Sequence, residues 1–140
     1  MSRALETSLV APVQSWSTDD VSVLTLTAQA AATVPSSDQF NPAGSGIKLV
    51  IDITAISGSS PTLTVTLQGK DTTSGKYYTI LASAALNATG TTVLTVFPGA
   101  TASANVAAND ILPHTWRVSA VVGGSGPSVT ATIGASVVSA

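Results

Sequence analysis

Residues 53–67, ITAISGSSPTLTVTL, contain a pattern that returns in residues 118–133, VSAVVGGSGPSVTATI. In both copies an alternating apolar run is followed by a stretch rich in Gly, Ser and Pro and by a second alternating run. When Pro61 is aligned with Pro127, the runs after the turn match position by position, and one extra residue in the second copy aligns the runs before it. Alternation at period two is typical of a strand with one buried face. Each copy therefore predicts a β-hairpin.

Outside the repeat, apolar and β-branched runs separated by turn residues predict further strands. In residues 21–33 the apolar positions change phase, which indicates a bulge or a strand buried on both faces. We expect a middle hairpin of residues 77–86 and 91–97 and a long connection at 100–113. The predicted strands are 21–33, 47–56, 62–68, 77–86, 91–97, 114–122 and 128–138, and a short strand within 37–40 is left open.

Seven to eight short strands with regularly spaced turn signals are typical of a sandwich or barrel. We predict an all-β fold, an antiparallel β-sandwich that is jelly-roll-like or immunoglobulin-like, with the strand order left open. Residues 1–20 are predicted to form an N-terminal arm, and residues 21–140 the sandwich domain. The alternation predicts these inward residues: Ile47, Leu49, Ile51, Ile53, Leu63, Val65, Leu67, Trp116, Val118 and Ala120.

Composition limits the classes of function. The 140 residues suffice for one domain with its own core. The chain has no cysteine, which fits the cytosol, and its N-terminus lacks the pattern of a signal peptide. Its net charge is −2 with five Lys and Arg scattered singly, and no apolar run reaches the length of a membrane-spanning helix. We therefore expect neither nucleic acid nor a membrane as a partner.

The sequence offers little for catalysis or for binding a cofactor. His114 is the single histidine, so any nucleophilic triad would have to use it; we expect it to lie half-exposed at a strand end. One histidine and no cysteine are too few ligands for zinc. Paired acidic or amide residues at 19–20 and 109–110 are candidate calcium ligands, and Asp52, Asp71 and Asp110 are candidate catalytic carboxylates. Turn capping and solvent exposure explain both groups better. We predict no enzyme, no metal and no cofactor.

Two groups of residues are candidates for contact with a partner. In the arm, large apolar residues recur at three to four positions, and they are Leu5, Leu9, Val13 and Trp16. Either Trp16 folds back on its own domain or the arm docks on a neighbouring subunit. The second group surrounds the turn at 70–76 and comprises Lys70, Asp71, Lys76, Tyr77 and Tyr78. Tyrosine is favoured at interfaces, although a solvated hairpin end explains this group slightly better.

The chain resembles small virion proteins of tailed bacteriophages over about residues 30–135. The resemblance is carried by a G-x-x-P-T-L turn within 57–63, a T-V-T-x-Q-G strand at 64–69, and a W-R-V strand followed by a G-x-x-P-S stretch within 116–128. These motifs consist of turn and strand residues, and residues before 21 lie outside the resemblance.

The resemblance implies a non-enzymatic component of the phage particle. Within that class a head decoration (cement) protein fits best, because such proteins are small, rich in β-structure and free of cysteine, and often form trimers on the shell. The implied partners are the major capsid protein and further copies of the chain as a homotrimer. The implied location is the capsid surface of the virion, after synthesis in the bacterial cytoplasm. The alternatives are a tail or fibre accessory protein and a carbohydrate- or surface-binding module.

Overall fold

The computed structural model describes residues 17–41 and 44–139, and every regular element in these ranges is a β-strand. The all-β prediction is therefore confirmed. The strands are β1 (Ser17–Gln29), β2 (Ala32–Pro35), β3 (Gln39–Phe40), β4 (Gly44–Asp71), β5 (Lys76–Ala82), β6 (Gly90–Val96), β7 (Ala107–Ala108) and β8 (Thr115–Ser139). Two of them, β4 and β8, are much longer than the usual strand of about 3–10 residues.

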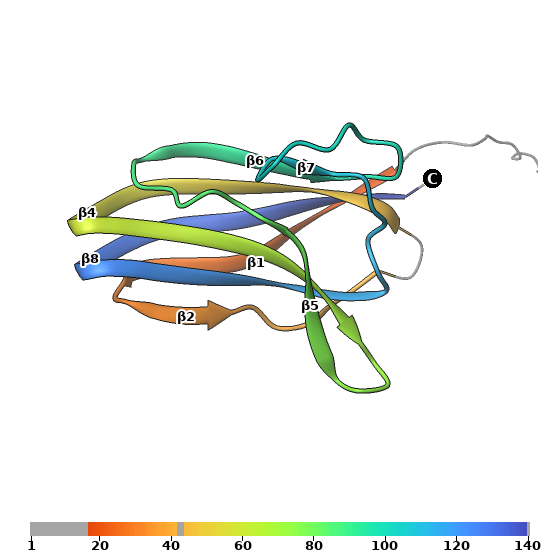
Figure 1. The fold of residues 1–140 in the computed structure, drawn as a ribbon, viewed down its shortest axis with the longest axis horizontal. Coiled ribbons are helices and arrows are strands. Elements are labelled where there is room, and N and C mark those ends of the chain that lie inside the picture. The colour runs from red at the N-terminus through yellow and green to blue at the C-terminus, as the bar shows by residue number, and fades with distance from the viewer. Residues whose placement is uncertain (1–16, 42–43, 140) are drawn as a thin grey trace, which may run out of the picture.

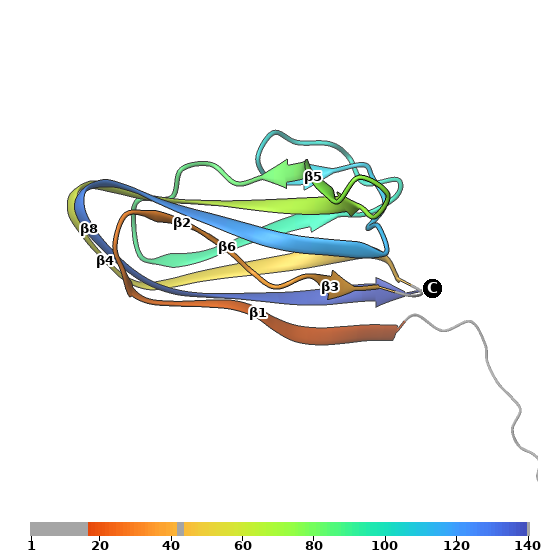
Figure 2. The same cartoon turned by 90° about the horizontal axis from the view of Figure 1, so that it is seen from below.

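The strands β4 and β8 pair antiparallel along almost their whole length and form one long ribbon (Figure 1). Residues 47–57 of β4 lie opposite 128–137 of β8, and residues 62–69 of β4 lie opposite 116–123 of β8. Between these stretches, at the two segments rich in Gly, Ser and Pro, the ribbon turns back over itself (Figure 2). The two halves of the ribbon therefore form the centres of two stacked layers.

The other strands flank the ribbon in both layers. The first layer runs in the order β1, second half of β8, first half of β4, β6, and β7 adds a short parallel pairing to β6. The second layer runs in the order β2 with β3, first half of β8, second half of β4, β5. If each half counts as a strand, β2 with β3 counts as one and the short β7 is left out, the layers read 1-8-3-6 and 2-7-4-5. This is the order of a jelly roll, and the immunoglobulin-like alternative is excluded because its sheets combine other strands.

The two repeats are not hairpins, and this part of the prediction is wrong. The runs on either side of each Gly/Ser/Pro segment pair with the other copy and not with each other. The same residues instead form corners between the layers, which demand the same turn chemistry and the same alternation as a hairpin. A Cβ on Gly58, whose φ is 124°, would lie 2.8 Å from the Cα of Pro127. A Cβ on Gly124, whose φ is 109°, would lie 2.7 Å from the carbonyl oxygen of Ser60. The two corners thus pack backbone to backbone.

The predicted middle hairpin is also wrong, for the same reason. The strand β5 pairs with the second half of β4, whereas β6 pairs with the first half of β4 in the other layer. The chain between them crosses from one layer to the other. A true hairpin does join β4 to β5, where Asp71 lies opposite Lys76 and Gly75 takes a φ of 75°. The polar turn expected at 70–76 is therefore confirmed.

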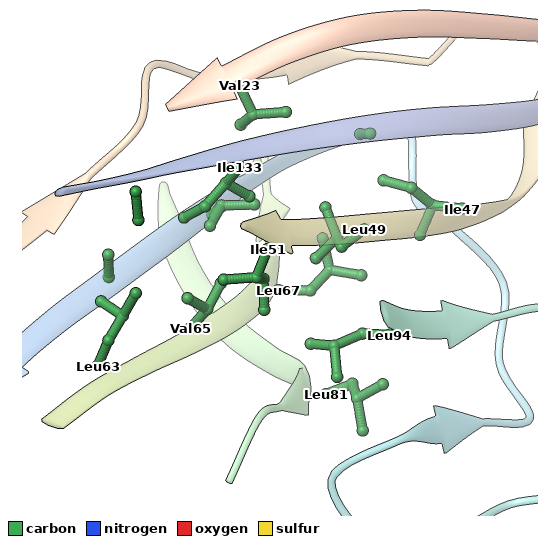
Figure 3. Packing of buried hydrophobic residues seen from close by; sticks show 14 of the residues in the cluster. Val23, Ile47, Leu49, Ile51, Leu63, Val65, Leu67, Leu81, Leu94 and Ile133 are labelled. Atoms are coloured by element: carbon green, nitrogen blue, oxygen red, sulfur yellow. The ribbon is translucent and has the colours of Figure 1, made fainter. Parts of the chain in front are cut away.

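The predicted core is confirmed. Each inward residue predicted from the alternation is no more than 2 % exposed. Figure 3 shows side chains of the two halves of β4, among them Leu49 and Val65, with Ile133 of β8 and Leu94 of β6 in the same cluster. Burial of each such side chain contributes about 1.5–3 kcal/mol. The phase change expected in 21–33 is also present, because the pairing of β1 with β8 shifts register twice within β1.

Candidate interaction surface

The outer surface of the second layer, the second face, carries a cluster of polar side chains that spans the layer. Arg117 comes from β8, Gln68 and Lys70 from β4, Tyr77 from β5, and Asp38 from the segment between β2 and β3. The register explains the grouping, because Gln68 lies opposite Arg117 and Lys70 lies opposite Tyr77. Both β4 residues alternate with buried Leu67 and Gly69 and therefore point outward. We call these five residues the Arg117 cluster.

Arg117 is held at the centre of the cluster by two contacts. Its guanidinium carbon lies 3.4 Å from the centroid of the Tyr77 ring. Its Nε–H donates a hydrogen bond of 2.8 Å to Oε1 of Gln68. A cation over an aromatic face is attracted by the ring quadrupole, with a gain of about 0.5–1 kcal/mol at exposed sites. The guanidinium therefore has a defined position on the second face.

Asp38 closes the other side of the cluster. The hydroxyl of Tyr77 donates to its Oδ1 at 2.7 Å, and the ammonium of Lys70 donates to its Oδ2 at 2.9 Å. The hydrogen bond from Tyr77, and then that from Lys70, lower the pKa of Asp38 below its ordinary value. The hydrogen bond to Asp38 in turn raises the pKa of Lys70. The carboxylate of Asp38 is thus neutralised by its own ion pair.

Lys70 and Tyr77 are the predicted contact residues that the structure brings together in the cluster. Asp71 instead caps its own turn, because it accepts hydrogen bonds from the hydroxyl of Ser74 at 2.7 Å and from the backbone N–H of Thr73 at 3.1 Å. These bonds, with the bond from Ser74 the larger cause, lower the pKa of Asp71. Lys76 is exposed at the hairpin end.

Tyr78 lies apart from the cluster, on the opposite side of β5 from Tyr77. Its ring occupies the space beside Gly69, where a Cβ would overlap with Cζ of the tyrosine. The tyrosine remains 48 % exposed. The arm candidates Leu5, Leu9, Val13 and Trp16 lie outside the described residues.

Three members of the cluster were not predicted from the sequence, namely Asp38, Gln68 and Arg117. The alternation contained a signal for two of them, because Arg117 lies between inward Trp116 and Val118, and Gln68 follows inward Leu67. Both therefore had to point outward from central strands. Asp38 gave no such signal, since it lies in a turn whose position depends on the tertiary fold.

The outer surface of the first layer, the first face, differs from the second. Val50 and Val93 are direct cross-strand neighbours and are 36 % and 41 % exposed. Beside them Gly134 leaves a hollow of about 360 Å³, which reaches to Asp20 on β1. A second hollow, of about 520 Å³, lies between β8, β4 and β6 and is lined mainly by apolar atoms, including those of Phe97. The first face thus contains two hollows, and most of the residues that line them are uncharged.

The residues considered for catalysis are not assembled into a site in the described ranges. The Nδ1 atom of His114 lies 3.2 Å from the hydroxyl of Thr115, and its ring packs against exposed Phe40. No carboxylate among the described residues contacts this histidine. Asp52 contacts the hydroxyl of Thr91 at 3.4 Å, and Asp110 accepts the N–H of Ile111 next to it.

Two further features of the described residues bear on function. Within 17–41 and 44–139, no three His, Cys, Asp or Glu side chains gather closely enough to hold a metal ion. Nor do these ranges contain a helix of the length and apolarity that would cross a membrane.

Comparisons with known proteins leave the chain without an assigned family. No protein-family description and no curated protein matches it. Among solved structures, a chain in the structure of infectious bursal disease virus, Gx strain, is similar with a TM-score of 0.47 and 14 % sequence identity. The match covers 96 % of this chain and 35 % of that chain, so this chain spans about a third of its length.

Proposed function

We propose that this chain is a virion structural protein, and within that class a decoration protein on the outer surface of a tailed-phage head. The observation that carries the proposal is a jelly-roll body whose two outer faces consist largely of Thr, Ser and Val. The jelly roll serves viral capsids as well as lectins and cupins, and a fold alone does not decide function. The chemistry of the two outer faces therefore has to distinguish among these functions.

The exposed valines support an interface. Val50 and Val93 form an apolar pair on the first face, and Val121, opposite Thr64 on the second face, is 42 % exposed. Only 9 % of the residues are charged, against about 25 % in ordinary domains. Such a surface protects poorly against association, and contiguous exposed apolar residues mark sites of interaction. In a protein that is covered by a shell and by its own copies, these surfaces are buried and do not cause unwanted association.

The partners in this proposal are the major capsid protein and further copies of the chain in a homotrimer. Three copies seated together multiply weak contacts, because each further contact forms at a high effective concentration. The part of the predicted arm that precedes β1, residues 1–16 with their large apolar residues, adds a contact to the shell or to a neighbouring copy. The location is then the capsid surface, after synthesis in the bacterial cytoplasm.

The structure gives no support to the carbohydrate-binding alternative at Tyr77. A sugar stacks on an open aromatic face, but the guanidinium of Arg117 lies 3.4 Å from the centroid of this ring. The hydroxyl of Tyr77 is already bonded to Asp38. The tail or fibre alternative is distinguished by the experiment below.

The test is addition of the purified chain to heads and to tails isolated from particles that lack it. We expect saturable binding to heads, density on the outer shell in an image reconstruction, and a trimer in light scattering. Heads that already carry the protein are the control and should take up none. Binding to tails alone, or to neither, would contradict the assignment to the head. Removal of residues 1–16, which leaves β1 to β8 intact, should weaken binding to heads if the arm contributes.

A further inference from the structure

We propose that Arg117 is an anchor that receives the carboxylate of an acidic side chain on the shell protein. The inference rests on the proposed function and names the chemistry of the contact on the second face. It follows from three observations: the guanidinium is held in place, its terminal nitrogens are not used within the described chain, and the nearby aspartate is already occupied.

The guanidinium is held before any partner arrives. The Tyr77 ring lies against its carbon at 3.4 Å, and Gln68 accepts its Nε–H at 2.8 Å. Gln68 belongs to the second half of β4, and Tyr77 belongs to β5, which pairs with that same half. A side chain that is fixed in this way loses little conformational freedom when it binds, so more of the contact energy remains as affinity.

Most donors of this guanidinium are still available. An arginine side chain offers five N–H donors, and Gln68 takes the one on Nε. In residues 17–41 and 44–139 no side chain or carbonyl accepts a hydrogen bond from Nη1 or Nη2. The planar pair of terminal nitrogens matches the two oxygens of a carboxylate, which it binds through two parallel hydrogen bonds.

Asp38 does not fill this role. One of its oxygens is bonded to Tyr77 and the other to Lys70. The cluster contains two cations, Lys70 and Arg117, and one anion, Asp38, so its net charge is +1, and Arg117 is the cation that is not hydrogen-bonded to the aspartate. The second face thus offers one cation with a defined geometry to whatever covers it.

The acid belongs to a protein, and the shell protein is the assigned source. Nucleic acid binds through many phosphates and needs a broad positive field, whereas this chain has five Lys and Arg in total. A second copy of the chain offers two acids on its first face, Asp20 and Asp52. Contact between opposite faces of successive copies adds copies along one axis, which favours an open filament over a closed trimer.

The first experiment measures half-saturation of purified heads by variants of the full chain. Arg117→Lys keeps the charge and removes the planar donor pair, so we expect half-saturation to require a roughly tenfold higher concentration. Lys48→Gln removes an exposed positive charge on the first face, away from the cluster, and should stay within about twofold of the original chain. Melting followed by circular dichroism verifies that each variant is folded. Equal binding by Arg117→Lys and the original chain overturns the proposal.

Asp20→Asn and Asp52→Asn test the alternative source of the carboxylate. If the acid is on the shell protein, each variant binds heads as the original chain does. A loss in either variant as large as that of Arg117→Lys places the acid in a second copy and overturns the assignment to the shell.

The second experiment does not depend on heads. Arg3 and Arg117 are the two arginines of the chain. The Tyr77 ring, whose centroid lies 3.4 Å from the guanidinium carbon of Arg117, should give the side-chain N–H groups of Arg117 separate signals in nuclear magnetic resonance spectra. A hexaglutamate peptide at low salt should shift the Arg117 signal in a saturable way and leave that of Arg3 almost unchanged. No selective shift overturns the anchor, as does tighter saturation by inorganic phosphate. A selective shift without any binding to heads leaves the anchor standing and rejects the proposed function.

Discussion

Each outer face of the sandwich contains strand segments from both copies of the sequence repeat, yet the chemistry of the two faces differs. On the second face, the outward positions at the end of the repeated strand are Gln68 and Lys70, which belong to the Arg117 cluster. On the first face, the same positions of the repeat are Gly134 and Ser136, which line a hollow of about 360 Å³. At these positions the second face carries side chains of a charged cluster, whereas the first face has a hollow.

The contrast extends to the start of the repeat. The alignment that places Ile53 with Val118 also places Asp52 with Arg117, so an acid on one face corresponds to a base on the other. The inward positions do not diverge in this way, since Leu67 and Ile133 are equivalent and both fully buried. The core restricts inward positions to apolar residues, whereas each face is free to specialise.

The largest expected effect concerns the corners that join the two faces. Gly124→Ala places a Cβ 2.7 Å from a backbone oxygen at a φ of 109°, so we expect a loss of about 2–4 kcal/mol in the free energy of unfolding. Gly126→Ala, at a φ of 56° with no atom within 4 Å, should lose about 1 kcal/mol. Urea denaturation measures both. Equal losses would mean that the close approach of the corners is unimportant.

Two glycines near the ends of the repeat sharpen the contrast between the layers. Gly69→Ala in the second layer should cost about 1–2 kcal/mol, because the new methyl group displaces the Tyr78 ring. Gly134→Ala in the first layer should change stability by less than about 0.5 kcal/mol, since the nearest atom is 3.8 Å away. If Gly69→Ala is just as costly in a Tyr78→Ala background, the ring is not the cause.

A third pair compares the charged positions of the repeat. Arg117→Ala removes the contact with Tyr77 and the hydrogen bond to Gln68, so we expect a loss of about 1 kcal/mol in unfolding free energy. Asp52→Ala on the first face removes a long hydrogen bond to Thr91 and should cost less than about 0.5 kcal/mol. Chemical denaturation of the two variants in the same buffer measures both losses. A larger loss in Asp52→Ala than in Arg117→Ala would mean that the charged side chain on the first face contributes more to stability.

The smallest expected effect is the response of the second face to acid. Because Tyr77 and Lys70 lower the pKa of Asp38, its stabilising contribution is complete above the ordinary value of 3.8 and is lost as pH falls through the lower folded value. Urea midpoints measured below about pH 4 should therefore fall less steeply in Asp38→Asn than in the original chain. Tyr77→Phe removes the hydrogen bond that lowers the pKa of Asp38 most, so it should also flatten the dependence of the urea midpoint on pH. An unchanged dependence would mean that this hydrogen bond does not stabilise the fold.

The sequence predicted strands and core well because alternation reports local burial directly. The inward residues of 47–53, 63–67 and 116–120 follow from period two alone, and all are buried. The pairing of those strands was not predictable in the same way. A hairpin and a corner between layers both need Gly58 or Gly124 in an unusual conformation, and both keep the apolar residues facing inward. Only the distant partner strand distinguishes them.

The candidate surface was predicted in part for a similar reason. Lys70 and Tyr77 lie on either side of one turn, so the local sequence brings them together. Arg117 and Asp38 reach them across β8 and β4, from positions that no local pattern connects. Asp71 caps its own turn instead of joining the cluster, and a turn-capping aspartate and a contact aspartate look alike in sequence.

The bent ribbon also has a consequence for synthesis of the chain on the ribosome. The two halves of β4 occupy the centres of both layers, but their partner β8 lies in the last residues, 115–139. Until those residues emerge, β4 has open edges and an uncovered apolar side, which is the condition in which nascent β-proteins aggregate. Completion of either layer must therefore wait until residues 115–139 have emerged, and a chain that stops before residue 115 leaves each layer without one of its two central strands.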